Sequence, residues 1–348
     1  MQASSVTIGG GVATAANNGR VTPKPLRLSA GDWVEVRSAS EILATLDDRG
    51  RLDGLPFTPE MLQYCGHRYR VLKSAHKTCD TIKSYRLRAM PNAVHLDQLR
   101  CDGAAHDGCQ ARCLLFWNAS WLKPVSSGAN AERPISASGD DGDFLATAGI
   151  ENLQRNTRIP PGIREEGDAD VYSCQATALL DASTPLRWRD PRHYLRDLTS
   201  RNVGIVTFVR YVALAAFRIF WRWFARDPKY PYVPGTGPAS QPTAPLNLQP
   251  GDLVRVRSRD EIFRTLTPGR TNHGLWFDVE MEPLCGKVCK VLARVDHIVD
   301  EKTGKMIRMK RDCIILEEGT CGGCLSRDRL FCPRQIYSYW REAWLERV

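Results

Sequence analysis

Two stretches of the chain are nearly identical: GDWVEVRS at residues 31–38 and GDLVRVRS at residues 251–258. They lie inside a longer match, in which residues 28–72 align with residues 248–292 without a gap. Of the 45 aligned positions, 20 are identical. Similarity at this level within one chain indicates an internal duplication.

The match continues in a second block, which pairs the cysteines and tryptophans of residues 101–122 with those of residues 324–345. Between the two blocks the spacing of the copies grows by three residues, so one loop of the second copy is longer. We therefore predict two homologous modules, module 1 at residues 27–125 and module 2 at residues 246–348.

Within each module the sequence predicts short strands. The residues after the Gly-Asp turn alternate apolar and polar, which is typical of a strand with one buried face. In module 2, residues 287–311 predict a β-hairpin with Gly304 at its turn. Trp340, Trp344 and Leu345 have the spacing of an apolar helical stripe, so we expect a closing helix. Together these elements indicate a small, strongly bent β-barrel.

The opening strand and the hairpin resemble the SH3-like barrels that include KOW-type modules. The whole chain also resembles an uncharacterised bacterial protein family with repeated modules, through Cys285-Gly286, Cys321–Cys332 and Tyr339–Leu345. This resemblance implies a chain that is mainly β with some α. It implies two homologous small SH3-like β-barrel modules, each closed by a cysteine cluster and a Trp-rich helix. Linkers and one apolar, basic helix would join them.

The composition fits a globular protein of ordinary polarity. The chain has 348 residues, of which 43% are hydrophobic and 25% charged, which excludes wholesale disorder, a collagen-like repeat and a polytopic membrane protein. The N-terminal residues lack the pattern of a secretory signal, so we expect a cytoplasmic protein. In a reducing compartment the 12 cysteines are better explained as metal ligands or buried thiols than as disulfides.

The segments outside the modules differ strongly in composition. Residues 1–26 contain few large apolar side chains, which predicts a disordered tail, and residues 126–182 predict a flexible linker. Residues 183–226 form a basic segment with an amphipathic helix at 203–224. The six prolines of residues 227–245 predict an extended linker.

The helix at residues 203–224 reads VGIVTFVRYVALAAFRIFWRWF and contains no acidic residue. Residues 183–230 contain ten Lys and Arg against three acids, a local charge of +7 out of +9 for the chain. At 100° per residue its arginines share one arc, opposite an apolar arc. We expect a membrane surface or a partner to be bound by Arg210, Arg218, Trp221, Arg222, Trp223 and Arg226.

Three placements of this helix remain open. It can lie in the interface of an anionic membrane, which would put the protein at the inner face of that membrane. It can be buried between the modules, with its arginines paired to their carboxylates. It can also span a bilayer, although Arg210 would then lie near the middle.

Thiols and one imidazole recur at short spacing in both modules. Module 1 has Cys-x4-His-x2-Cys-x3-Cys and module 2 has Cys-x2-Cys-x7-Cys, and these are the ligand types of structural zinc. The candidate ligands are Cys65, Cys101, His106, Cys109 and Cys113 in module 1, and Cys285, Cys313, Cys321, Cys324 and Cys332 in module 2. The fourth ligand of each site is open, and buried thiols or redox chemistry are alternatives. Cys174 has no partner in the repeat and is interpreted as a chance residue.

No catalytic motif was found in the sequence. The first hypothesis is therefore a non-enzymatic, metal-stabilised interaction or scaffold protein that binds a protein or polymer partner, at an anionic membrane surface if the helix lies there. The second is a thiol-based redox sensor or enzyme centred on module 1, such as Cys79 beside His76 and Lys77. The third is nucleic-acid binding through KOW-like barrels and the arginines.

Overall fold

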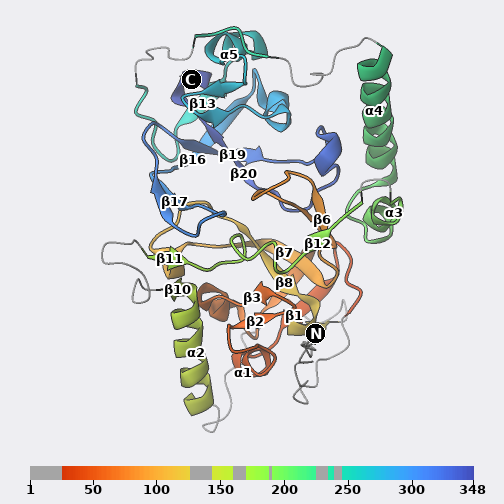
Figure 1. The fold of residues 1–348 in the computed structure, drawn as a ribbon, viewed down its shortest axis with the longest axis vertical. Coiled ribbons are helices and arrows are strands. Elements are labelled where there is room, and N and C mark those ends of the chain that lie inside the picture. The colour runs from red at the N-terminus through yellow and green to blue at the C-terminus, as the bar shows by residue number, and fades with distance from the viewer. Residues whose placement is uncertain (1–25, 126–142, 160–169, 188–189, 225–233, 239–244) are drawn as a thin grey trace, which may run out of the picture.

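The computed structural model describes residues 26–125, 143–159, 170–187, 190–224, 234–238 and 245–348. In Figure 1 module 1 is drawn in red to yellow-orange and module 2 in teal to blue, and each is built mainly of strands. The predicted disordered tail at residues 1–26 lies, except for its last residue, outside the described residues.

Module 1 contains one five-stranded antiparallel half-barrel sheet. Its strands, in order across the sheet, are β8 (Leu114–Asn118), β7 (Ala93–Arg100), β4 (Arg68–Ser74), β1 (Trp33–Val36) and β9 (Leu122–Pro124). A short helix and a small hairpin follow β1, namely α1 (Ala39–Leu43), β2 (Arg51–Leu52) and β3 (Leu55–Pro56). The 3₁₀ helix η1 (Pro59–Tyr64) precedes β4.

Module 2 repeats this sheet strand for strand. The order is β20 (Tyr337–Trp340), β19 (Ile314–Thr320), β16 (Val288–Arg294), β13 (Leu253–Val256) and β21 (Leu345–Arg347). Helix α5 (Arg259–Thr265), β14 (Thr271–Asn272), β15 (Leu275–Trp276) and η5 (Val279–Leu284) occupy the places of α1, β2, β3 and η1. The register is also repeated, since His95 pairs with Lys73 as Ile315 pairs with Ala293. The duplication is thus visible at the level of single residue pairs.

The first helix of each module begins at the same kind of cap. The Ser38 side chain accepts from the backbone N–H of Glu41 while Glu41 accepts from the backbone N–H of Ser38, and Ser258 and Glu261 repeat this capping box. The preceding Gly-Asp turn needs glycine, because Gly31 has φ of 92°.

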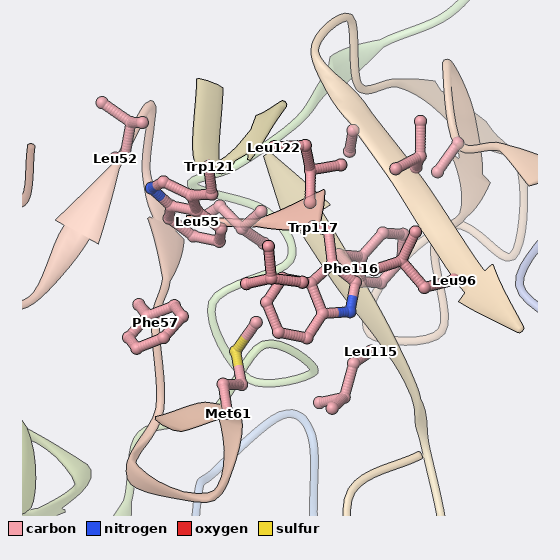
Figure 2. Packing of buried hydrophobic residues seen from close by; sticks show 14 of the residues in the cluster. Leu52, Leu55, Phe57, Met61, Leu96, Leu115, Phe116, Trp117, Trp121 and Leu122 are labelled. Carbon is pink, nitrogen blue, oxygen red and sulfur yellow. The ribbon is translucent and has the colours of Figure 1, made fainter. Parts of the chain in front are cut away.

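The Trp-rich segments are not the closing helices that the sequence predicted. Trp117 lies in β8 and Trp121 ends a single 3₁₀ turn, η3 (Ala119–Trp121), before β9. Both indoles are fully buried, and Phe57 packs edge-on against both of them (Figure 2). A strand followed by one tight turn also places residues four apart on one face, so the spacing alone does not distinguish it from a helix. In module 2, η7 (Glu342–Trp344) repeats the arrangement.

Each module extends a hairpin to the other module. The hairpin of module 1 is formed by β5 (Lys77–Cys79) and β6 (Leu87–Ala89), and that of module 2 by β17 (His297–Val299) and β18 (Met306–Arg308). The side-chain oxygen of Gln110 in module 1 accepts hydrogen bonds from the backbone N–H groups of residues 296 and 297. In the reverse direction, Arg334 of module 2 donates to the carbonyl of Cys79 and to Thr81. The modules are therefore joined by reciprocal contacts.

Part of the predicted flexible linker at residues 126–182 is folded. It contains α2 (Asp143–Thr157), β10 (Arg158–Ile159) and β11 (Val171–Tyr172), and β12 (Thr184–Pro185) pairs with β6 just after it. Leu153 and Leu179 are buried in the core of module 1. Gln175 is buried too. Its side-chain oxygen accepts a hydrogen bond from the backbone N–H of Phe116, and its side-chain nitrogen donates one to the carbonyl of the same residue. These contacts attach the segment to module 1, whereas residues 126–142 and 160–169 lie outside the described residues.

Along the chain, two helices lie between this segment and module 2. Helix α3 (Arg192–Thr199) packs on module 1, and α4 (Ile205–Phe224) stands at the right edge of the molecule in Figure 1. Of the predicted Pro-rich linker at 227–245, residues 234–238 and 245 are described. Gly237 there donates to the carbonyl of Leu266.

Candidate metal centre and exposed helix

The loop between β7 and β8 of module 1, residues 101–113, is folded back on itself. Gly103 has φ of 79° and precedes the 3₁₀ turn η2 (Ala104–His106). A Cβ atom at Gly103 would lie 2.0 Å from the backbone oxygen of Cys109, so only glycine fits there. The turn places His106 in the interior, where the residue is 1% exposed.

Three side chains meet at this turn: Glu60, Cys101 and His106. The thiol of Cys101 donates to Oε1 of Glu60 at 3.2 Å, and Nδ1 of His106 lies 3.5 Å from the same oxygen. One ligand atom of each residue lies within 4.8 Å of the other two. Glu60 is supplied by η1, 41 residues before Cys101. The cluster therefore unites two segments that are distant in sequence.

Within the described part of the chain, several polar atoms of the cluster are buried without a hydrogen-bond partner. They are Oε2 of Glu60 and both ring nitrogens of His106. Burying such groups unpaired costs roughly 1–3 kcal/mol each. A cation bound between the three residues would satisfy carboxylate oxygens of Glu60 and one ring nitrogen of His106. The donor set therefore fits a metal ion.

The three donors are of types that bind transition metals, zinc among them. A thiolate, an imidazole nitrogen and a carboxylate oxygen are all ligands of Zn²⁺, which prefers four ligands in a tetrahedron. Burial, and then the nearby charge of Glu60, raises the pKa of the Cys101 thiol. Metal binding would have to displace this proton, as it does at other thiolate sites.

A small cavity of about 40 Å³ opens beside the cluster. Glu60, Cys101 and His106 line it together with the three further thiols of Cys109, Cys113 and Cys174. Burial raises the pKa of Cys113 to about 12 and that of Cys174 to about 11. These three thiols are outside the group of ligand atoms that lie within 4.8 Å of one another.

The structure thus places the ligands predicted for module 1 at three locations. Cys101 and His106 belong to the cluster, whereas Cys109 and Cys113 line the adjoining cavity. Cys65 lies elsewhere, at the end of η1, where it packs against the hydrophobic core of the module. Burial raises its pKa to about 12.

The predicted ligands of module 2 form no comparable cluster among the described residues. Cys285 packs on the main core of the module, and Cys313 is buried in a second core cluster. Cys321, Cys324 and Cys332 lie in the loop between β19 and β20. The carboxylate at the position of Glu60, Glu280, instead accepts three backbone N–H groups, those of residues 324, 325 and 326, at 3.1, 2.7 and 2.7 Å.

Two residues of the site were missed in the sequence. Glu60 has a signal that could have found it, since an acid recurs at the equivalent position 280, just before a cysteine that also recurs. Cys174 was interpreted as a chance residue, yet it lines the cavity because Gln175 fixes its segment to module 1. No spacing rule would have linked it to the loop at residues 101–113.

Among the described residues, helix α4 contacts module 2 along one side. The half-buried residues of this side are Phe208, Tyr211, Leu214, Ala215 and Arg218. Phe208 stacks on Phe331 with ring centroids 5.4 Å apart, and the Arg218 guanidinium donates to the backbone oxygen of Leu325. This stripe therefore faces the cysteine loop of module 2.

The opposite side of α4 is exposed and apolar. Val206 is 79% and Trp223 82% exposed, and the same arc includes Ile205, Val209, Phe217, Ile219, Phe220 and Phe224. A helix buried between the modules is therefore wrong for the described residues. Likewise, Arg218 pairs with a backbone carbonyl rather than with a carboxylate.

The other predicted surface residues of this helix are placed as follows. Arg210 and Trp221 are exposed, as is Trp223. The side chain of Arg222 and the whole of Arg226 lie outside the described residues. None of the helices in the described ranges combines the length and the apolar character needed to cross a bilayer.

In comparisons with known proteins, no family model matches the chain, and no match was found among curated proteins or solved structures.

Proposed function

We propose that the chain is a non-enzymatic interaction protein. It consists of two SH3-like modules that bind a protein or polymer partner, with a structural zinc ion in module 1 and α4 resting on an anionic membrane surface. The observation that supports this proposal most directly is the orientation of α4.

The two sides of α4 match the two environments of an interfacial helix. Its half-buried stripe, with Arg218, is turned to module 2, while the apolar arc points away from the protein. Apolar patches of this kind on a soluble domain mark interaction surfaces. The local charge of +7 in residues 183–230 adds attraction to anionic lipids.

A structural role for the metal agrees with the geometry of module 1. Glu60 and His106 are buried, and they join η1 to the loop at residues 101–113. One of the three thiols in the adjoining cavity would complete a closed set of four ligands, which is typical of structural zinc. Such a site would hold the loop against η1, close to the hairpin of module 2.

The membrane proposal can be tested by co-sedimentation of the full chain with vesicles. Vesicles of phosphatidylcholine with phosphatidylglycerol should bind the protein more strongly than vesicles of phosphatidylcholine alone. Replacing Val209 and Phe220 together by Asp should lower binding at least tenfold, because each apolar side chain contributes roughly 1.5–3 kcal/mol when buried.

The matched control is Ile307→Asp, which adds a charge at an exposed apolar residue on β18, outside α4. It should bind vesicles like the wild type. Equal binding by the α4 variant and the wild type would remove the membrane from the proposal. A loss in both variants would point to a general charge effect.

A further inference from the structure

A pair of buried thiols joins the two modules. Cys79 lies at the end of β5 in the hairpin of module 1, and Cys332 lies in the loop of module 2 before β20. Each residue is 4% exposed, and both belong to one small core cluster with Leu87. Their side chains come together in this cluster, from opposite modules.

This pair has no counterpart in the other half of the molecule. The equivalent contact there joins Val299 to Cys109, and the backbone N–H of Val299 donates to the sulfur of Cys109 at 3.3 Å. The repeat thus brings these two equivalent positions together twice, and in the described residues both positions are cysteines at 79 and 332 alone. A cysteine at residue 79 is therefore not needed for packing of the hairpin.

A buried positive charge lies beside the pair, and such a charge favours a thiolate over a neutral thiol. Arg334 is close by and donates to the carbonyl of Cys79 at 3.4 Å. The positive charge beside Cys79 therefore comes from Arg334, and the sequence-based hypothesis that His76 and Lys77 activate this thiol is wrong.

Those two side chains are directed to α3 instead. Nε2 of His76 lies 3.1 Å from the carbonyl oxygen of His193, and Nζ of Lys77 lies 2.5 Å from Oδ2 of Asp197. Their role is to fasten α3 to module 1. The two thiols are equally buried and line one cavity, so either can act as the nucleophile and the other as its resolving partner.

The thiols are accessible to small molecules. Both line a cavity of about 240 Å³, and Tyr85 and Trp276, which line it too, are 55% and 44% exposed. The cavity therefore reaches the surface. It is large enough for a peroxide, although the thiols themselves are shielded from larger reagents.

We propose that Cys79 and Cys332 form a reversible, peroxide-sensitive disulfide that locks the two modules together. The thiolate of one cysteine attacks one peroxide oxygen, the O–O bond breaks, and water leaves after protonation. The resulting sulfenic acid is attacked by the sulfur of the other cysteine, which loses its proton as a second water is released. Two thiols and one hydrogen peroxide thus become one disulfide and two waters, and a small dithiol reverses the step by exchange.

The test treats the reduced full chain with one equivalent of hydrogen peroxide and then alkylates the remaining thiols. Two of the 12 thiols should be lost, and digestion without reductant should yield one peptide pair linking residues 79 and 332. Dithiothreitol should restore both thiols. The oxidised protein should also melt at a higher temperature than the reduced protein.

The repeat supplies the matched variant Cys79→Val, which introduces the residue found at position 299. Its reduced form should melt like the reduced wild type, but peroxide should form no disulfide and should not raise its melting temperature. Cys109→Ala should still form the 79–332 link. If this variant melts far below the wild type, Cys332→Ala tests the same loss.

Three results would overturn the proposal. They are twelve alkylatable thiols after peroxide, a disulfide that does not include Cys79 and Cys332, or a link that forms no faster than disulfides elsewhere in the chain. These readouts do not involve vesicles or metal, so they are independent of the proposed function.

Discussion

The two modules share one scaffold but use the same buried acid differently. In module 1, Glu60 faces a thiol and an imidazole, and in module 2, Glu280 is enclosed by three backbone N–H groups. At the position of His106, module 2 has Arg329, which pairs with Asp278 at 2.5 Å. The loop of module 2 is also three residues longer. The difference shows how one scaffold can carry either a ligand site or a closed structural contact.

The difference between the two acids can be tested by neutralising each of them in turn. Glu60→Gln should lower the zinc content of the purified protein from about one ion per chain to background, because it removes one of three ligands. Glu280→Gln should leave the zinc content unchanged. Elemental analysis after dialysis checks both, and zinc loss in both variants would show that the metal is not held by module 1 alone.

When zinc is absent, the free energy of unfolding should be lowered more by Glu280→Gln than by Glu60→Gln. Glu280→Gln replaces an acceptor of three N–H groups by an amide, so the free energy of unfolding should fall by about 1–3 kcal/mol. Glu60→Gln removes the acceptor of only one thiol, and its apo form should change by less. Urea unfolding with a chelator present measures both, and equal losses would contradict this distinction.

The third comparison concerns His95, whose place in module 2 is taken by Ile315. Burial lowers the pKa of His95 to about 3. Below pH 6.5 the unfolded chain therefore binds a proton that the folded chain does not. Stability from this residue is present above pH 6.5 and is lost as the pH falls towards 3. The loss is about 1.4 kcal/mol per pH unit, or about 2 kcal/mol between pH 6.5 and 5.

His95→Ile should remove this share of the pH dependence of unfolding. Ile315→Val at the equivalent position should leave the pH dependence as in the wild type. Buried His76 and His193 stay in both variants, so the relevant measurement is the difference between variant and wild type at each pH. An unchanged slope in His95→Ile would refute the assignment.

The smallest expected effect tests the scaffold itself. The indole N–H of Trp121 donates to Oγ1 of Thr45 at 3.1 Å, and Trp344 donates to Thr265 at 2.9 Å. Thr45→Val and Thr265→Val should each lower the free energy of unfolding by about 1 kcal/mol. Unequal losses would show that the two cores have diverged more than their registers suggest.

The sequence predicted the architecture better than the site. Both modules can be located by aligning the chain with itself, because the two copies are similar in sequence. The strand register follows the same offset of 220 residues. The closing tryptophans were assigned to a helix because their spacing fits both a helix and a strand with a tight turn. The structure distinguishes the two, because Trp117 lies in a strand, Trp121 ends a tight turn, and both pack against Phe57.

The candidate site could be predicted only in part, because its residues come from separate segments. Cys101 and His106 share one loop and were found by spacing. Glu60 is 41 residues away from Cys101, and Cys174 approaches through a segment with no repeat partner. Pairs such as Cys79 and Cys332, from opposite modules, depend on how the modules dock, which local patterns do not encode.

The reciprocal hairpins have a consequence for how this protein can have arisen. Thr81 and Glu301 are equivalent positions of the two hairpins, and their side chains touch each other. Contacts between equivalent residues are the hallmark of an isologous dimer, in which both subunits use the same patch. A single chain with this arrangement is what the fusion of two subunits of a homodimer produces. Once fused, each half is free to change alone, as Cys79 and Val299 have done.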